Sequence, residues 1–159
     1  MKIERLLPGL ALIGFLLCIS IPPVMGATFN VTNPSQFQTA LTTAATNGQD
    51  DVINVAAASY SVTSTLEYSS GENYALTIKG AGSSTTVLDG GDDVRILSIT
   101  TSLANANVTI QDLGFQNGTT TGNGGCLQIS VASASVVFSH CLVSDCTATG
   151  AIVLVAAAI

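Results

Sequence analysis

The chain contains little positive charge. Four Lys plus Arg residues stand against ten Asp plus Glu among its 159 residues, which gives a formal net charge of −6 at pH 7. Proteins that bind nucleic acid or anionic membrane surfaces use many Lys and Arg side chains to neutralise phosphates. This shortage therefore excludes nucleic acid as a partner and argues against attachment to an anionic membrane.

Residues that bind metals or carry out nucleophilic catalysis are equally scarce. Histidine occurs once, at His140, and tryptophan is absent. No Cys stands at a metal-ligand spacing from His140, so a zinc site is not expected. The sequence contains no nucleophile elbow, no catalytic Cys/His pair and no cofactor motif. We therefore assign no catalytic residue and expect no cofactor.

The first 26 residues have the pattern of a secretory signal peptide. Lys2 and Arg5 precede an apolar run from Leu6 to Ile21, and compact residues follow before Ala27. The run is shorter than the ~20 residues that a transmembrane helix needs, so we expect cleavage and no stable membrane span afterwards. The expected localisation is secreted or at the cell surface.

Three cysteines follow the predicted cleavage point, namely Cys126, Cys141 and Cys146. Export makes disulfides possible, and the odd number leaves at least one thiol unpaired within the chain. Cys141 occupies an inward position, where a small buried hydrophobic side chain is expected. Both Cys141–Cys146 and Cys126–Cys146 remain open as pairings.

Residues 27–48 are expected to form a short strand and one capping helix. Asn33 can cap a helix over Thr32–Gly48, Pro34 suits its first position, and Gly48 suits its end. Phe37, Leu41 and Ala44 lie on one face. Because an isolated helix of this length is marginally stable in water, its apolar face must pack against the rest of the domain.

Beyond residue 48 the apolar residues alternate and then repeat. Leu76 and Ile78 begin one copy, Val108 and Ile110 begin the next 32 residues later, and Val136 and Phe138 begin a third after a further 28. Such periods are typical of solenoids. The other predicted equivalences are Leu113 with Cys141, Phe115 with Val143, Gly125 with Gly150, Leu127 with Ile152, Ile129 with Leu154, and Leu97 and Ile99 with Leu127 and Ile129.

Each copy contains two or three very short strands and no room for a second helix. Stacking like residues on like buries a continuous apolar column. We therefore predict an all-β fold, a right-handed parallel β-helix, over residues 49–159. The final segment, "AIVLVAAAI", ends inside a repeat. We expect this chain to be an amino-terminal fragment of a longer surface protein, with another chain covering its end as the alternative.

The ordered segments "NPSQFQTALTTAATNGQDDVINVA", "LTIKGAGSSTTVLDGG", "VTIQDLGFQNGTTTGNGG" and "SHCLVSDCTATGAI" support a family resemblance. On the basis of these segments, the chain resembles secreted right-handed β-helix proteins of the pectin-lyase-like superfamily, and more closely the large surface proteins of that type. That superfamily includes polysaccharide lyases that hold calcium with carboxylates and use an Arg or Lys as base. It also includes hydrolases that use several aspartates on one face.

The resemblance draws attention to "LDGGDDVR". Asp89, Asp92 and Asp93 are the calcium candidates, and Arg95 is the nearby base. Asp and Gly are also the residues that turns select. We favour a turn, with the aspartates outside the outward strand positions and Arg95 paired at the surface with Asp92 or Asp93.

These observations favour a non-enzymatic exported module that acts in adhesion or carbohydrate contact. Its expected partners are an extracellular polysaccharide or another surface protein. Tyr60, Tyr68 and Tyr74 are the aromatic side chains that would stack on sugar rings if exposed. The alternative is a fragment of a polysaccharide lyase or glycoside hydrolase whose active cleft lies on missing coils.

Overall fold

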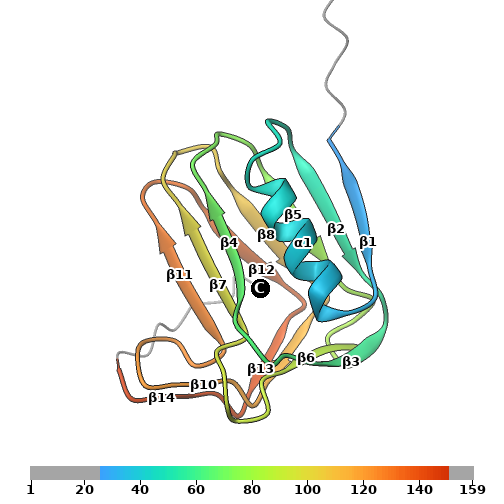
Figure 1. Ribbon diagram of the computed structural model, residues 1–159, viewed down its shortest axis with the longest axis vertical. Coiled ribbons are helices and arrows are strands. Elements are labelled where there is room, and N and C mark those ends of the chain that lie inside the picture. The colour runs from blue at the N-terminus through green and yellow to red at the C-terminus, as the bar shows by residue number, and fades with distance from the viewer. Residues whose placement is uncertain (1–25, 151–159) are drawn as a thin grey trace, which may run out of the picture.

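The computed structural model describes residues 26–150. Most of the predicted signal peptide and the predicted partners Ile152 and Leu154 lie outside these residues. The described chain is an all-β parallel solenoid with one helix near its N-terminal end, as predicted (Figure 1). Every strand pairing within these residues is parallel.

Three sheets form the faces of the solenoid, and a short fourth sheet extends one corner. Sheet A has the order β1 (Thr28–Val31), β2 (Asp51–Val55), β5 (Leu76–Lys79), β8 (Val108–Gln111) and β12 (Val136–Ser139). Sheet B has the order β13 (Leu142–Ser144), β9 (Gly114–Gln116), β6 (Thr86–Asp89) and β3 (Ala58–Ser61). Sheet C has the order β11 (Leu127–Val131), β7 (Leu97–Thr101) and β4 (Leu66–Ser70), and β10 (Thr119–Thr120) pairs with β14 (Thr147–Ala148).

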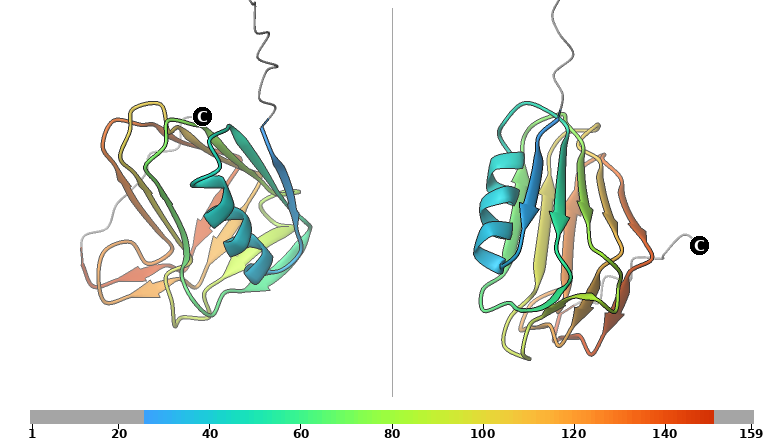
Figure 2. Two further views of the ribbon diagram at one scale, coloured as in Figure 1. Left: turned by 45° about the horizontal axis from the view of Figure 1, so that its top comes forward. Right: turned by 90° about the vertical axis from the view of Figure 1, so that its right-hand side faces the viewer.

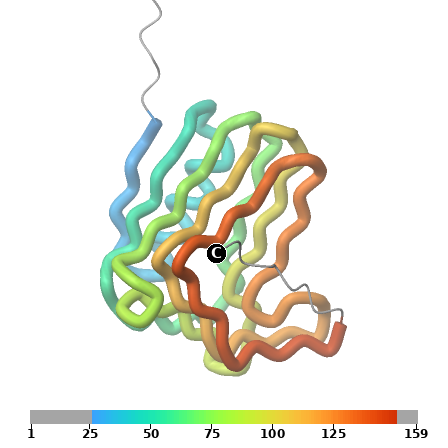
Figure 3. The backbone as a smooth tube through the Cα atoms, turned by 180° about the vertical axis from the view of Figure 1, so that it is seen from behind, coloured from blue at the N-terminus to red at the C-terminus, as the bar shows by residue number. Residues whose placement is uncertain are grey.

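Successive coils stack with like positions in register, and Figure 3 shows them side by side in chain order. Ile53 lies opposite Ile78, and Ile78 lies opposite Ile110. All three are fully buried. Each buried Ile or Leu stabilises the fold by about 1.5–3 kcal/mol, so this inner column is a main source of stability.

The predicted equivalences between coils are mostly confirmed. The register pairs Val136 with Val108 and Phe138 with Ile110, and Phe115 with Val143. It also pairs Leu97 and Ile99 with Leu127 and Ile129. Phe115 and Phe138 are buried, whereas Val143 in the last described rung is 49% exposed.

One predicted equivalence is wrong. Gly150 donates its backbone N–H to Gly122 rather than lying opposite Gly125. Gly125 instead approaches the backbone of Thr147 so closely that a Cβ atom would collide with the Thr147 carbonyl. The start of the turn between β10 and β11 therefore lies beside the start of the turn that follows β14, with Gly122 next to Gly150.

The helix α1 (Pro34–Ala44) forms within the predicted range. The Asn33 side chain accepts from the Gln36 N–H at its start, and Pro34 occupies the first turn. Phe37, Leu41 and Ala44 are buried as predicted. Figure 2 shows α1 at one end of the coil stack and the last strands at the other, so the helix caps the N-terminal end of the core.

Candidate functional site

The Asp89 carboxylate is held by three N–H donors, one from the neighbouring strand β9, one from the residue that follows it, and one from the turn after β6. Gln116 Nε2 donates to Oδ2 at 2.8 Å, Asn117 Nδ2 donates to Oδ1 at 3.1 Å, and the Gly91 backbone N–H donates to Oδ1 at 2.9 Å. These hydrogen bonds, led by the one from Gln116, lower the pKa of Asp89. Both carboxylate oxygens are thus occupied in joining one coil to the next.

The expectation that all three aspartates lie away from outward strand positions is wrong for Asp89. Asp89 is the last residue of β6 and stands in the outer row of sheet B beside Gln116. The exposed Asp92 and Asp93 do lie in the turn, and Asp92 has a φ of 60°. Within residues 26–150 no group of three or more His, Cys, Asp or Glu side chains is placed to hold a metal ion.

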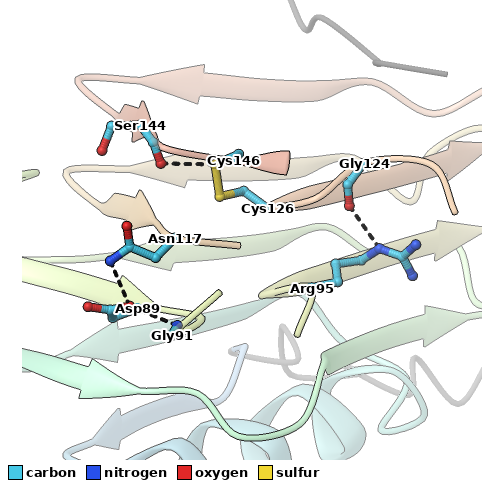
Figure 4. Close-up of a disulfide and its surroundings, with 8 residues drawn as sticks. All are labelled: Asp89, Gly91, Arg95, Asn117, Gly124, Cys126, Ser144 and Cys146. Carbon is cyan, nitrogen blue, oxygen red and sulfur yellow. Dashed lines mark hydrogen bonds between the residues drawn. A yellow bond between two sulfur atoms is a disulfide. The ribbon is translucent and has the colours of Figure 1, made fainter. Parts of the chain in front are cut away.

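Arg95 does not pair with Asp92 or Asp93, which corrects the sequence-based expectation. Its guanidinium donates to the Gly124 carbonyl at 3.0 Å and the Asn123 carbonyl at 2.7 Å. Figure 4 shows the Arg95 side chain directed toward Gly124 and away from Asp89. The only ion pair in the described part of the chain is the one between His140 and Asp112. Arg95 therefore fixes the long turn between β10 and β11.

That turn also carries one end of a disulfide. Cys126 and Cys146 are bonded, with their Cα atoms 5.4 Å apart, a separation typical of protein disulfides (Figure 4). Cys126 is buried and directly precedes β11, whereas Cys146 lies in the turn before β14. Since β10 and β14 are adjacent strands, the disulfide joins neighbouring coils. Of the two pairings left open by the sequence, this is the one that forms.

Cys141 is a free, partly buried thiol packed against the core. Its S–H lies within hydrogen-bonding distance of the Ile110 carbonyl at 3.5 Å, and burial raises the pKa of the thiol. Next to it, His140 Nδ1 lies 3.6 Å from Asp112 Oδ1, and His140 is largely exposed. An exposed pair of this kind contributes at most about 1 kcal/mol when the histidine is protonated.

The tyrosines do not form a sugar-stacking surface. Tyr60 and Tyr68 are 5% and 2% exposed, so their rings are not open to a ligand. Burial raises the pKa of both hydroxyl groups. Tyr74 is 41% exposed and is the one ring of the three that a ligand can reach.

The outer face of sheet A places side chains in two straight rows, with one residue per coil in each row, and most of these side chains are polar. Asn30, Asn54, Lys79, Gln111 and Ser139 form one row, and Asn54 Nδ2 donates to Asn30 Oδ1 at 3.1 Å. Thr28, Val52, Thr77, Thr109 and Val137 form the second. Strand spacing sets neighbours in a row ~4.8 Å apart. Lys79 is the only charged side chain in these two rows.

Two tertiary contacts could not be inferred from sequence pattern. Asp51 is buried, and its Oδ1 accepts from the Ala27 N–H and from Asn47 Nδ2, while Oδ2 has no hydrogen-bond partner. Gln38 of α1 binds the backbone of Glu67 in β4. The alternation "DVINVA" contains the one available signal, because it places Asp51 on the inward side with Ile53.

Comparison with known proteins assigns no family. No protein-family model, no curated protein and no solved structure matches the chain significantly. Among residues 26–150, none of the helical structure has the length and apolar character needed to cross a membrane.

Proposed function

We propose that the chain is an exported module of a cell-surface or extracellular protein, of the pectin-lyase-like β-helix type, and that the outer face of sheet A binds neutral polysaccharide. The observation that carries this proposal is the pair of outer rows on sheet A. Their amide and hydroxyl groups are the donors and acceptors that sugar hydroxyls need, repeated once per coil.

The charge of the chain supports a neutral ligand over an acidic one. The formal net charge is −6, and the two rows contribute one positive charge, from Lys79. An acidic polysaccharide would be repelled by the molecule as a whole. Export is supported by the signal-peptide pattern of residues 1–26 and by the Cys126–Cys146 disulfide, a bond that persists in oxidising compartments.

The observations favour adhesion over catalysis. Lyase chemistry at the candidate cluster would need Asp89 free to hold calcium and Arg95 free to accept a proton. Instead Asp89 accepts three N–H groups and Arg95 binds two backbone carbonyls. Both residues are used to hold turns together.

Pull-down on insoluble neutral polysaccharides tests the proposal. Gln111→Ala removes an amide from the outer face of sheet A, and each lost hydrogen bond of about 1 kcal/mol weakens binding about five-fold. Gln128→Ala is the matched control, because Gln128 has similar exposure but stands on sheet C. Equal binding by both variants would contradict the assignment of the face, and release of reducing or unsaturated sugars would contradict a non-enzymatic role.

A further inference from the structure

The helix α1 covers the edge of one sheet and leaves the edge of another open. At the edge of sheet C, Gln38 Nε2 donates to the Glu67 carbonyl at 2.9 Å, and the Glu67 N–H donates to Gln38 Oε1 at 2.7 Å. The Gln38 side-chain amide therefore makes the two hydrogen bonds to Glu67 that a neighbouring strand would make, so the backbone of the β4 edge is partly hydrogen-bonded. At the edge of sheet A, β1 has a strand partner on one side only, β2.

The free side of β1 presents backbone groups at two residues. The carbonyls of Ala27 and Val31 accept from the N–H groups of Val52 and Ala56 in the β2 segment. Alternate residues of a parallel strand bond to opposite sides, so Thr28 and Asn30 direct their N–H and C=O groups away from β2.

A groove runs along this strand. One wall is β1, and the other is formed by Ser35, Gln36, Thr39 and Thr43 of α1. Figure 2 shows α1 beside β1 at the end of the stack. Phe29, which is partly buried, also lines the groove and packs against the core. The groove thus combines a strand edge, an apolar side chain and a wall of hydroxyl and amide groups.

The groove lies in an uncharged part of an otherwise acidic chain. Residues 26–49 contain no Asp, Glu, Lys, Arg or His. Exposed edge strands are commonly guarded by Lys or Pro, or are covered by other segments. The β1 strand, "TFNV", carries neither residue. A charged partner segment would find no opposite charge near β1, whereas an uncharged segment can pair with this edge without burying an unpaired charge.

We propose that the β1 edge and its groove are a docking site for an uncharged, extended segment of a partner polypeptide, which adds to sheet A as a further strand. Backbone bonds to Thr28 and Asn30 supply the affinity in this mode of recognition. A side chain beside Phe29 would be apolar, and those beside Thr28 and Asn30 would be hydroxyl or amide. Thr28 and Asn30 also begin the two outer rows of sheet A, but this docking mode uses their backbone groups, so it does not depend on the proposed polysaccharide binding.

An NMR titration of the full chain with a neutral peptide tests the proposal. The probe is N-acetylated, C-amidated Ala-Asn-Val-Thr-Ile-Gln, which copies residues 106–111, because sheet A places Ile110 in the row of Phe29. We expect shifts at the Thr28 and Asn30 amides and slower hydrogen exchange there, by about ten-fold at saturation. A peptide with Ile110→Asp should not bind.

Protein variants separate the groove from its surroundings. Thr39→Arg places a long charged side chain in the groove and should weaken binding at least about five-fold. Thr46→Arg is the matched control, because Thr46 is exposed, also donates to the carbonyl four residues earlier, and does not line the groove.

Three results would overturn the proposal. The first is the absence of shifts at Thr28 and Asn30 with millimolar peptide. The second is equal binding by Thr39→Arg and Thr46→Arg. The third is protection of the same amides without peptide, by a second copy detected in light scattering or by residues 1–25. None of these results depends on polysaccharide binding.

Discussion

The side-chain amide of Gln38 lies against the backbone of Glu67 as a peptide group of a neighbouring strand would. It donates to the Glu67 carbonyl and accepts from the Glu67 N–H, at 2.9 and 2.7 Å. One side chain thus satisfies both polar groups of an edge residue that a further coil would otherwise satisfy. The cap acts through hydrogen bonds as well as through its apolar face.

Gln38→Met tests this contribution. The substitution keeps the length of the side chain and removes both hydrogen bonds to Glu67, each worth about 0.5–1.5 kcal/mol net, together with an exposed one to Thr42 within the helix. We expect the free energy of unfolding to fall by about 1–3 kcal/mol and the Glu67 amide to exchange faster. Urea unfolding and hydrogen exchange measure the two effects. Unchanged exchange at Glu67 would show that the contact does not protect this edge.

The Cys126–Cys146 disulfide should stabilise the solenoid by about 3 kcal/mol, because the bonded residues are 20 apart in the sequence. Cys146→Ser should lower the urea midpoint accordingly. Cys141→Ser, at the free thiol, is the control and should cost less than about 1.5 kcal/mol. Alkylation of the folded chain followed by peptide mass analysis should leave Cys126 and Cys146 unmodified. Labelling of either would contradict the pairing.

Asp89 should make the stability depend on acid pH. Its pKa is lower in the folded chain than in the unfolded chain, so its contribution is present above the unfolded pKa of about 4. It is lost as the pH falls through the folded pKa. We expect Asp89→Asn to reduce stability at pH 7 by about 1–2 kcal/mol through the lost charged acceptor.

The pH profile distinguishes this effect from a general loss of packing. The difference in the free energy of unfolding between wild type and Asp89→Asn should begin to narrow below about pH 4, where the Asp89 carboxylate of the unfolded chain is protonated. It should close as the pH falls through the lower folded pKa. Urea unfolding of both proteins from pH 2 to 7 measures this difference in the free energy of unfolding. Asp93→Asn is the control, because Asp93 is exposed in the adjacent turn and its replacement should matter by less than about 0.5 kcal/mol. A constant difference at all pH values would contradict the charged role of Asp89.

Arg95 should behave as a structural residue. Arg95→Met removes the bonds to the carbonyls of Asn123 and Gly124 and should lower the free energy of unfolding by about 1–3 kcal/mol. Arg95→Lys should lose part of this amount, because an ammonium group lacks the planar fork of donors. Exposed Lys79→Met provides the control for loss of a positive charge. Equal thermal stability of Arg95→Met and wild type would show that the turn does not need this anchor.

The inner columns were predictable because each depends only on spacing along the chain. Ile78, Ile110 and Phe138 recur at nearly constant intervals, and burial follows from the alternation. The helix was predictable for a similar reason, since Asn33, Pro34 and its apolar stripe are local signals.

The partners of Arg95 were not predictable from local pattern. Asp92 and Asp93 are close in sequence, but the carbonyls that bind the guanidinium belong to a turn about one coil further along. The burial of the tyrosines was not predictable for another physical reason. Tyr60 stands in the same inward row as Leu88, and alternation in so short a strand does not show which face is inward.

The register of the last coils has a consequence for growth of the molecule. Val136 lies opposite Val108, Leu142 opposite Gly114, and Thr147 opposite Thr119, so each is 28 residues further along the chain. The turns between the strands repeat at the same 28-residue spacing. Asp112 and His140 both have a positive φ, and so do Asn117 and Asp145. A tandem copy of residues 108–135 would therefore join to both neighbours with every strand and corner in phase. Such a gene can lengthen its product by a whole coil without disturbing this register.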